Sequence, residues 1–133
     1  MNILIVDDEV IVVNLLKKHI DWQGLGIHEV FTAYTAMDAR RLVSGNQIDI
    51  IICDIAMPQE NGLMLLAWIR ENFPDIVKII LTGYPDFKYA QDAINIGVVK
   101  YLLKPVSFEE LSETIRLAAE EINKKRNESL QGN

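Results

Sequence analysis

The feature that most constrains the fold lies in residues 48–58, where an unbroken apolar run over residues 50–53 ends at one carboxylate, Asp54. Three consecutive isoleucines, residues 50–52, precede Cys53 and Asp54 without any alternation of polar and apolar side chains. A strand that is buried on both faces, as in the middle of a parallel sheet, has this pattern. Open α/β sheets bind their ligands at the carboxyl ends of such strands. We therefore expect Asp54 to lie at the ligand-binding edge of a parallel sheet.

Shorter apolar segments alternate with amphipathic segments along the rest of the chain. The predicted strands cover residues 3–6, 29–33, 48–54, 77–81 and 99–103. The predicted helices cover about residues 9–21, 35–43, 63–72, 86–96 and 107–126. Strands that alternate with helices over short connections pair in parallel through right-handed crossovers, and the helices cover both faces of the sheet. Because five strands are too few to close an eight-stranded barrel, we expect a (βα)5 α/β sandwich of three layers.

The last two helices are defined by their apolar positions and by the signals at their ends. The apolar positions of the helix over residues 86–96 are Phe87, Ala90, Ala93 and Ile94. Gly97 ends this helix. A capping box at residues 107–110 starts the final helix, which we expect to turn Phe108 inward and to fray after residue 126.

Length and composition describe one folded domain. The chain has 133 residues, half of them hydrophobic, which suits a single domain with a real core. No apolar run approaches the roughly 20 residues that cross a bilayer, and the acids directly after residue 6 argue against a secretory signal. We therefore expect a cytoplasmic protein with one domain over residues 1–124, followed by a polar tail or the start of a linker over residues 125–133.

Charge and cysteine content narrow the functional classes. A net charge of −6 argues against direct binding of nucleic acid by this segment, which would carry a basic stripe. The basic residues 124–126 suit the last turns of a helix, where cations complement the helix dipole. Cys53 is the only cysteine, so the chain forms no internal disulfide and no thiolate metal cluster is expected.

Polar side chains follow four of the five predicted strands. Asp7 and Asp8 come directly after the first strand, Asp54 ends the third, Thr82 follows the fourth and Lys104 follows the fifth. The carboxyl ends of parallel strands lie along the same edge of a sheet. We therefore expect three carboxylates, a hydroxyl and an ammonium to gather at one edge.

Such a group of residues suits the acceptance of a phosphoryl group. Carboxylates at contact distance repel each other by on the order of 4 kcal/mol per pair at an effective dielectric constant near 20. A hard divalent cation such as Mg²⁺ offsets this repulsion and neutralises an incoming phosphoryl group. An aspartate can act as the nucleophile and form an acyl phosphate. No histidine or hydrophobic pocket is evident that would tune a general acid, so proton-transfer chemistry fits less well.

Four short motifs carry a resemblance to a known family. They are IVDDE at residues 5–9, DIAMP at residues 54–58 with Gly62, LTG at residues 81–83 and YLLKP at residues 101–105. In this order, each at the end of a predicted strand, they resemble the receiver domain of bacterial two-component response regulators. The resemblance runs from residue 3 to about residue 122. It implies a flavodoxin-like fold with strand order 2-1-3-4-5 and a cis peptide bond between Lys104 and Pro105.

The resemblance also implies a phosphoacceptor and a metal site. Asp54 would be the phosphoacceptor. Asp8 and Asp54 would bind Mg²⁺ directly, together with the backbone carbonyl of Ala56, and Asp7 would act through a water molecule. The residue types at these positions match the family, and Ala56 is a mild variation because its ligand would be a backbone atom.

Two further roles follow from the resemblance. Thr82 and Lys104 would hold the phosphoryl oxygens, and Thr82 would move toward the new group. Tyr101 would be the family's rotating aromatic residue. The implied donor is a sensor histidine kinase, and the implied output is a homodimer formed through the face of the fourth helix, the fifth strand and the fifth helix.

A narrower resemblance points to transcription. Residues 20–22, 81–90 and 97–106 are similar to receivers that precede arabinose-regulator-type helix-turn-helix domains. These residues contain no such output domain. The chain is therefore either the receiver part of a longer transcriptional regulator or a stand-alone receiver that acts through protein–protein contacts.

Each of these residues also has a simpler explanation. Asp7 and Asp8 could cap the first helix, Thr82 could be a solvated loop hydroxyl, and Tyr101 could be an ordinary half-buried strand residue. Lys104 could be a surface lysine before a turn proline. Two other functions stay open: a receiver-like module that is never phosphorylated, and an aspartyl-nucleophile phosphatase. Haloacid-dehalogenase-like phosphatases need a second aspartate where this chain has Ala56, so the phosphatase fits poorly.

Overall fold

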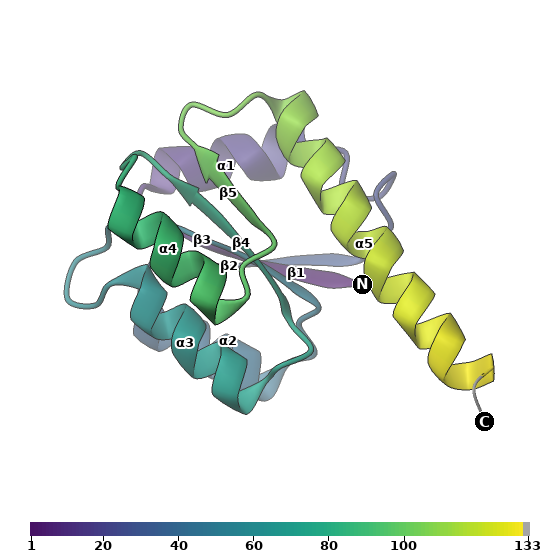
Figure 1. Cartoon of the computed structure of the whole chain (residues 1–133). Helices are drawn as coiled ribbons and strands as arrows, with labels where there is room; N and C mark the ends of the chain where they lie inside the picture. The colour runs from purple at the N-terminus through teal and green to yellow at the C-terminus, as the bar shows by residue number, and fades with distance from the viewer. Residues whose placement is uncertain (132–133) are drawn as a thin grey trace.

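The computed structural model describes residues 1–131 and shows five strands alternating with five helices (Figure 1). The strands are β1 (Asn2–Val6), β2 (Glu29–Ala33), β3 (Ile50–Cys53), β4 (Val77–Thr82) and β5 (Lys100–Leu103). The helices are α1 (Val10–His19), α2 (Ala36–Gly45), α3 (Gly62–Asn72), α4 (Phe87–Ile96) and α5 (Phe108–Gln131). All strand pairs are parallel, in the order β2-β1-β3-β4-β5. The predicted three-layer (βα)5 sandwich and its strand order are confirmed.

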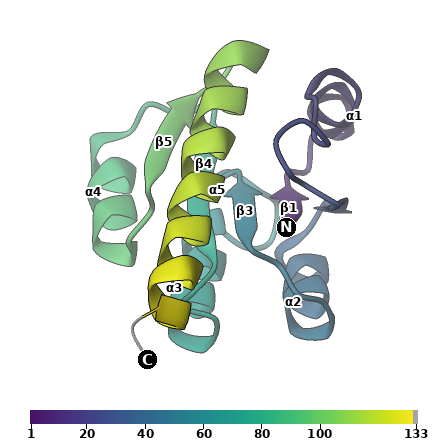
Figure 2. The ribbon, with the colours of Figure 1, turned by 90° about the vertical axis from the view of Figure 1, so that its right-hand side faces the viewer.

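Strand β3 lies in the middle of the sheet and is buried on both faces. It pairs with β1 on one side and with β4 on the other, and all four of its residues are buried. Because successive side chains of a strand point to opposite faces, Ile50 and Ile52 pack with α1 and α5, whereas Ile51 and Cys53 pack with α2, α3 and α4. Figure 1 and Figure 2 show these two helical layers on either side of the sheet.

Side-chain caps begin helices α2, α4 and α5 at or next to the predicted positions, and Asn61 caps α3. The hydroxyl of Thr35 accepts a hydrogen bond from the amide of Asp38 at the start of α2, and the hydroxyl of Ser107 accepts one from the amide of Glu110 at the start of α5. Asp86 caps α4 in the same way. Gly97 ends α4 in the left-handed region, with φ of 88°, as expected of a glycine at this position.

Helix α4 buries less of its apolar surface than its sequence suggests. Phe87 and Ile94, two of its apolar positions, are 78% and 74% exposed, and Ala93 is the one fully buried residue of the helix. Phe108 in α5 was expected to turn inward but is exposed and stacks on His19, with ring centroids 5.0 Å apart. Strand β5, beside which α4 lies, is at the edge of the sheet, so the sheet offers α4 only a narrow surface to cover.

Helix α5 is longer than predicted. It continues to residue 131, so the expected fraying of residues 127–131 was wrong; residues 132–133 lie outside the described part of the chain. An ion pair between Arg126 and Asp49 fastens this part of the helix to the amino end of β3. The boundary between residues 124 and 125 remains a prediction. Within residues 1–131, the structure has no helix both long and apolar enough to pass through a membrane.

Candidate functional site

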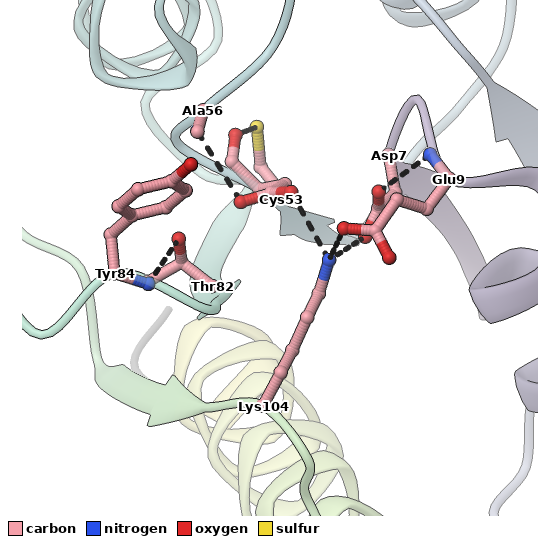
Figure 3. Close-up of polar contacts among 8 residues, drawn as sticks. Asp7, Glu9, Cys53, Ala56, Thr82, Tyr84 and Lys104 are labelled. Atoms are coloured by element: carbon pink, nitrogen blue, oxygen red, sulfur yellow. Dashed lines mark hydrogen bonds and ion pairs between the residues drawn. The ribbon is translucent and has the colours of Figure 1, made fainter.

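Lys104 gathers three carboxylates at the carboxyl edge of the sheet. Its Nζ lies 2.7 Å from Oδ2 of Asp7, 3.1 Å from Oδ2 of Asp54 and 3.2 Å from Oε1 of Glu9. Figure 3 shows the lysine reaching from the end of β5 toward the loop that follows β1. The peptide bond between Lys104 and Pro105 is cis, as the family resemblance implied.

The cluster is buried on one side and open on the other. The side chains of Asp7 and Asp54 are 4% exposed and that of Lys104 is 14% exposed, whereas Glu9 is 57% exposed. Burial alone would lower the pKa of Lys104. Its hydrogen bonds and ion pairs with Asp7 and Asp54 have the larger combined effect, so the pKa of Lys104 is raised. Burial raises the pKa of Asp7, and the hydrogen bond from Lys104 opposes this rise. Lys104 is therefore an ammonium ion at neutral pH.

The carboxylates provide a suitable donor set for a hard cation. Asp7, Glu9 and Asp54 each offer an oxygen atom, and these oxygens lie within 4.8 Å of one another. Three carboxylates face a single ammonium, so their mutual repulsion is only partly offset. Carboxylate oxygens that remain open to solvent on one side are the ligands that Mg²⁺ prefers. The residues present therefore fit a magnesium ion.

Glu9 belongs to the acidic group of the structure, although no metal-binding or catalytic role was predicted for it. The amide of Glu9 donates a hydrogen bond to Oδ1 of Asp7 at 2.9 Å, and this turn brings the Glu9 side chain back toward Lys104. The sequence signal that could have identified Glu9 as part of this group is its position directly after Asp7 and Asp8. Asp8 is partly exposed and does not belong to the group of three carboxylates. A direct metal bond from Asp8 remains a prediction.

The loop after β3 folds back onto Asp54. The amide of Ala56 donates to Oδ1 of Asp54 at 3.3 Å, and the amide of Gly62 donates to the carbonyl of Ile55 at 2.8 Å. Gly62 lies so close to the backbone of Asp54 that a Cβ atom on Gly62 would be 1.9 Å from the carbonyl oxygen of Asp54. Ala56 is exposed at this edge, and its carbonyl as a metal ligand remains a prediction.

Thr82 and Tyr101 both bind the backbone of Tyr84, in the loop between β4 and α4. The buried Thr82 hydroxyl accepts a hydrogen bond from the Tyr84 amide at 3.4 Å, and the Tyr101 hydroxyl donates one to the Tyr84 carbonyl at 2.8 Å. Figure 3 shows Thr82 beside Tyr84 and on the same edge as Lys104. Burial raises the pKa of Tyr101, which keeps its phenol protonated and able to donate. The switch roles of both residues remain predictions.

Comparison with known proteins identifies the family. Residues 3–116 match the model of the response regulator receiver domain. The chain therefore belongs to the receiver domain family of response regulators.

Three similar proteins illustrate the relationship. The chain is 38% identical to the transcriptional regulatory protein HptR of Staphylococcus aureus over 109 residues, which cover 82% of this chain and 42% of HptR. It is 34% identical to the solved receiver domain of AraT, a response regulator of Geobacillus stearothermophilus, with a TM-score of 0.87 and coverage of 94% of this chain and 97% of that one. A receiver domain from Methanospirillum hungatei gives a TM-score of 0.87 at 29% identity, covering 93% of this chain and 97% of that one.

The curated relatives are much longer than this chain. The chain spans less than half of the length of the curated relatives it matches. Several of these relatives are named as transcriptional regulatory proteins. The chain thus corresponds to the receiver part of such proteins.

Proposed function

We propose that the chain is a phosphoacceptor receiver and that Asp54 accepts a phosphoryl group from a sensor histidine kinase. The observation that supports this most directly is the contact of Lys104 with both Asp54 and Asp7 at the open edge of the sheet. One cation placed between the proposed nucleophile and a neighbouring carboxylate is also placed to meet a phosphoryl oxygen.

The transfer follows from these positions. A carboxylate oxygen of Asp54 forms a bond to phosphorus, the bond from phosphorus to the histidine nitrogen breaks, and the freed imidazole takes up a proton. Lys104 transfers one of its contacts from a carboxylate to a phosphoryl oxygen. Bound Mg²⁺ would supply further positive charge, held directly by Asp8, Asp54 and the carbonyl of Ala56 and through a water molecule by Asp7.

The loop between β4 and α4 connects this reaction to the surface. Thr82 and Tyr101 share Tyr84 as their backbone partner, so a shift of Thr82 toward the phosphoryl group disturbs the partner of Tyr101. Such a local change shifts the equilibrium between two conformations of a surface, and a partner protein can bind one of them preferentially.

We further propose that the phosphorylated chain forms a homodimer through α4, β5 and α5. Large apolar side chains are exposed on these elements, among them Phe87 and Ile94 of α4, Leu103 of β5 and Leu117 of α5. Transcriptional output would come from a domain outside these residues, as the length and names of the relatives suggest. A stand-alone receiver is the alternative, and a cytoplasmic location, where we expect the donor kinase domain, stays a prediction.

The test is chemical modification with a small phosphoryl donor. Acetyl phosphate and Mg²⁺ should add one phosphoryl group to the chain, seen by intact mass, and Asp54→Asn should abolish the addition. Asp38→Asn removes an exposed carboxylate of α2 and should leave it unchanged. An unmodified wild-type chain, or a modified Asp54→Asn chain, would overturn the proposal.

A further inference from the structure

Arg40 in α2 contacts the loop that follows the proposed phosphoacceptor, although it lies 14 positions before Asp54 in the sequence. Its guanidinium forms an ion pair and hydrogen bond with the carboxylate of Glu60, in the loop between β3 and α3. The same guanidinium lies over the ring of Trp68 in α3, with its central carbon 5.3 Å from the ring centroid. One side chain thus links α2, α3 and the loop after Asp54.

The loop that Arg40 contacts carries local backbone strain. Gln59 has a positive φ of 74°, in a region that side chains other than glycine rarely adopt. A residue in this region costs on the order of 1 kcal/mol and persists only where its surroundings hold it. The neighbouring Glu60 is held on both sides, because its amide donates to the carbonyl of Pro58 at 2.8 Å and its carboxylate binds Arg40.

The burial of the pair distinguishes it from an ordinary surface ion pair. The side chains of Arg40 and Glu60 are 30% and 26% exposed, whereas the adjacent pair of Arg41 and Asp38 is 72% and 51% exposed. Exposed pairs contribute little because water screens them and both side chains lose entropy. The Trp68 ring orders the guanidinium of Arg40 before it binds, so less entropy is lost on pairing.

We infer that Arg40 is a positioning residue for the loop after Asp54. It acts through Glu60 and holds the strained segment, residues 57–61, in the conformation that places Ala56 beside the carboxylate of Asp54. Its effect on metal binding and phosphorylation rests on the function proposed above. Its effect on the loop itself does not.

The test removes the pair from each side separately. Arg40→Met keeps an unbranched apolar side chain against Trp68 but loses the charge, and Glu60→Gln keeps the shape of the other partner. Each variant should speed hydrogen exchange of the amides in residues 56–61 and weaken Mg²⁺ binding, measured by calorimetry, by about threefold to fivefold. The double variant should be no worse than either single variant, because both remove the same interaction.

The matched control is Arg41→Gln, which breaks the exposed pair of the same helix and should change neither readout. Arg40→Lys keeps the charge but not the planar group over Trp68, so it should restore only part of the loss. Unchanged loop exchange in Arg40→Met and Glu60→Gln overturns the inference, as does an equal effect of Arg41→Gln. If the wild-type chain takes no phosphoryl group while the loop exchange still responds to Arg40, the proposed function fails and the positioning role stands.

Discussion

The hydroxyl of Tyr101 donates a hydrogen bond to the backbone carbonyl of Tyr84 across 2.8 Å, and it thereby ties the edge strand β5 to the loop after β4. The amide of the same Tyr84 donates to Thr82, so both predicted switch residues share one partner. A movement of either Thr82 or Tyr101 therefore alters a hydrogen bond of the Tyr84 backbone.

Tyr101→Phe removes one of these two bonds and keeps the ring. Because the bond lies at the surface, the free energy of unfolding should fall by only about 1 kcal/mol. Hydrogen exchange of residues 83–86 should speed up, and the Asp54 modification by acetyl phosphate should continue. Unchanged exchange in this loop would show that Tyr101 is an ordinary strand residue.

Lys104→Met separates metal binding from phosphoryl transfer. The lysine occupies the same carboxylate oxygens that a divalent cation would use, so its removal should strengthen Mg²⁺ binding several-fold while the rate of modification by acetyl phosphate falls at least tenfold. Calorimetry and intact mass measure the two effects. Weaker Mg²⁺ binding in Lys104→Met would show that the ammonium organises the carboxylates rather than competing for them.

The fold could be predicted because its signals are local. The unbroken apolar run of β3 identified a central strand, and the alternation of strands and helices defined the parallel sheet. The topology then placed Asp7, Asp54 and Lys104 at one edge, where the structure brings them into contact. Thr82 lies at the same edge but binds Tyr84.

The remaining features depend on contacts between distant segments. The contact between Glu9 and Lys104 joins residues 95 positions apart, and the pair of Arg40 and Glu60 joins residues 20 positions apart. Periodicity likewise cannot tell how much of a helix the sheet will cover, so the exposure of Phe87 in α4 could not be read from the sequence. Such features follow from packing, which only the folded chain defines.

Gly62→Ala should disrupt the loop that carries Asp54. The new Cβ atom would lie 1.9 Å from a backbone oxygen that no side-chain rotation can move, so the destabilisation should reach about 3 kcal/mol. Gly45→Ala is the matched control, because nothing lies within 4 Å of a Cβ atom at the end of α2. It should be neutral or stabilise by up to about 1 kcal/mol. Equal effects of the two variants on urea unfolding would contradict the close approach at Gly62.

Lys78 in β4 should make stability depend on pH in the alkaline range. It is 5% exposed, and burial, assisted by the charge of Arg70, lowers its pKa from the usual 10.5. The unfolded chain therefore binds this proton more tightly, and stability rises with pH between the folded-state pKa and 10.5.

Lys78→Met should accordingly raise the free energy of unfolding by on the order of 1 kcal/mol at pH 7. The gain should shrink as the pH approaches 10.5. Lys100→Met, which removes an exposed lysine of β5, controls for the change in net charge. A gain that stays constant from pH 7 to above 10 would show that the charge of Lys78 costs nothing in the folded state.

Arg126→Gln tests how the last turns of α5 are held to the sheet. Asp49 is only 6% exposed; it accepts a hydrogen bond from the amide of Asn2 at 2.8 Å and forms its ion pair with Arg126. Of these two partners of the buried Asp49 carboxylate, only the Asn2 amide remains when the arginine is removed. Because Arg126 itself is half exposed, water can partly replace it, and the free energy of unfolding should fall by about 1 kcal/mol.

Hydrogen exchange of residues 123–131 should rise more than that of residues 108–119, since this pair lies in the last turns of the helix. Lys125→Gln removes an exposed neighbouring charge and should leave both quantities unchanged, and Asp49→Asn combined with Arg126→Gln should cost less than the sum of the single changes. Equal exchange in Arg126→Gln and Lys125→Gln would mean that packing of the preceding turns, through Ile122, is sufficient to hold the helix to its end.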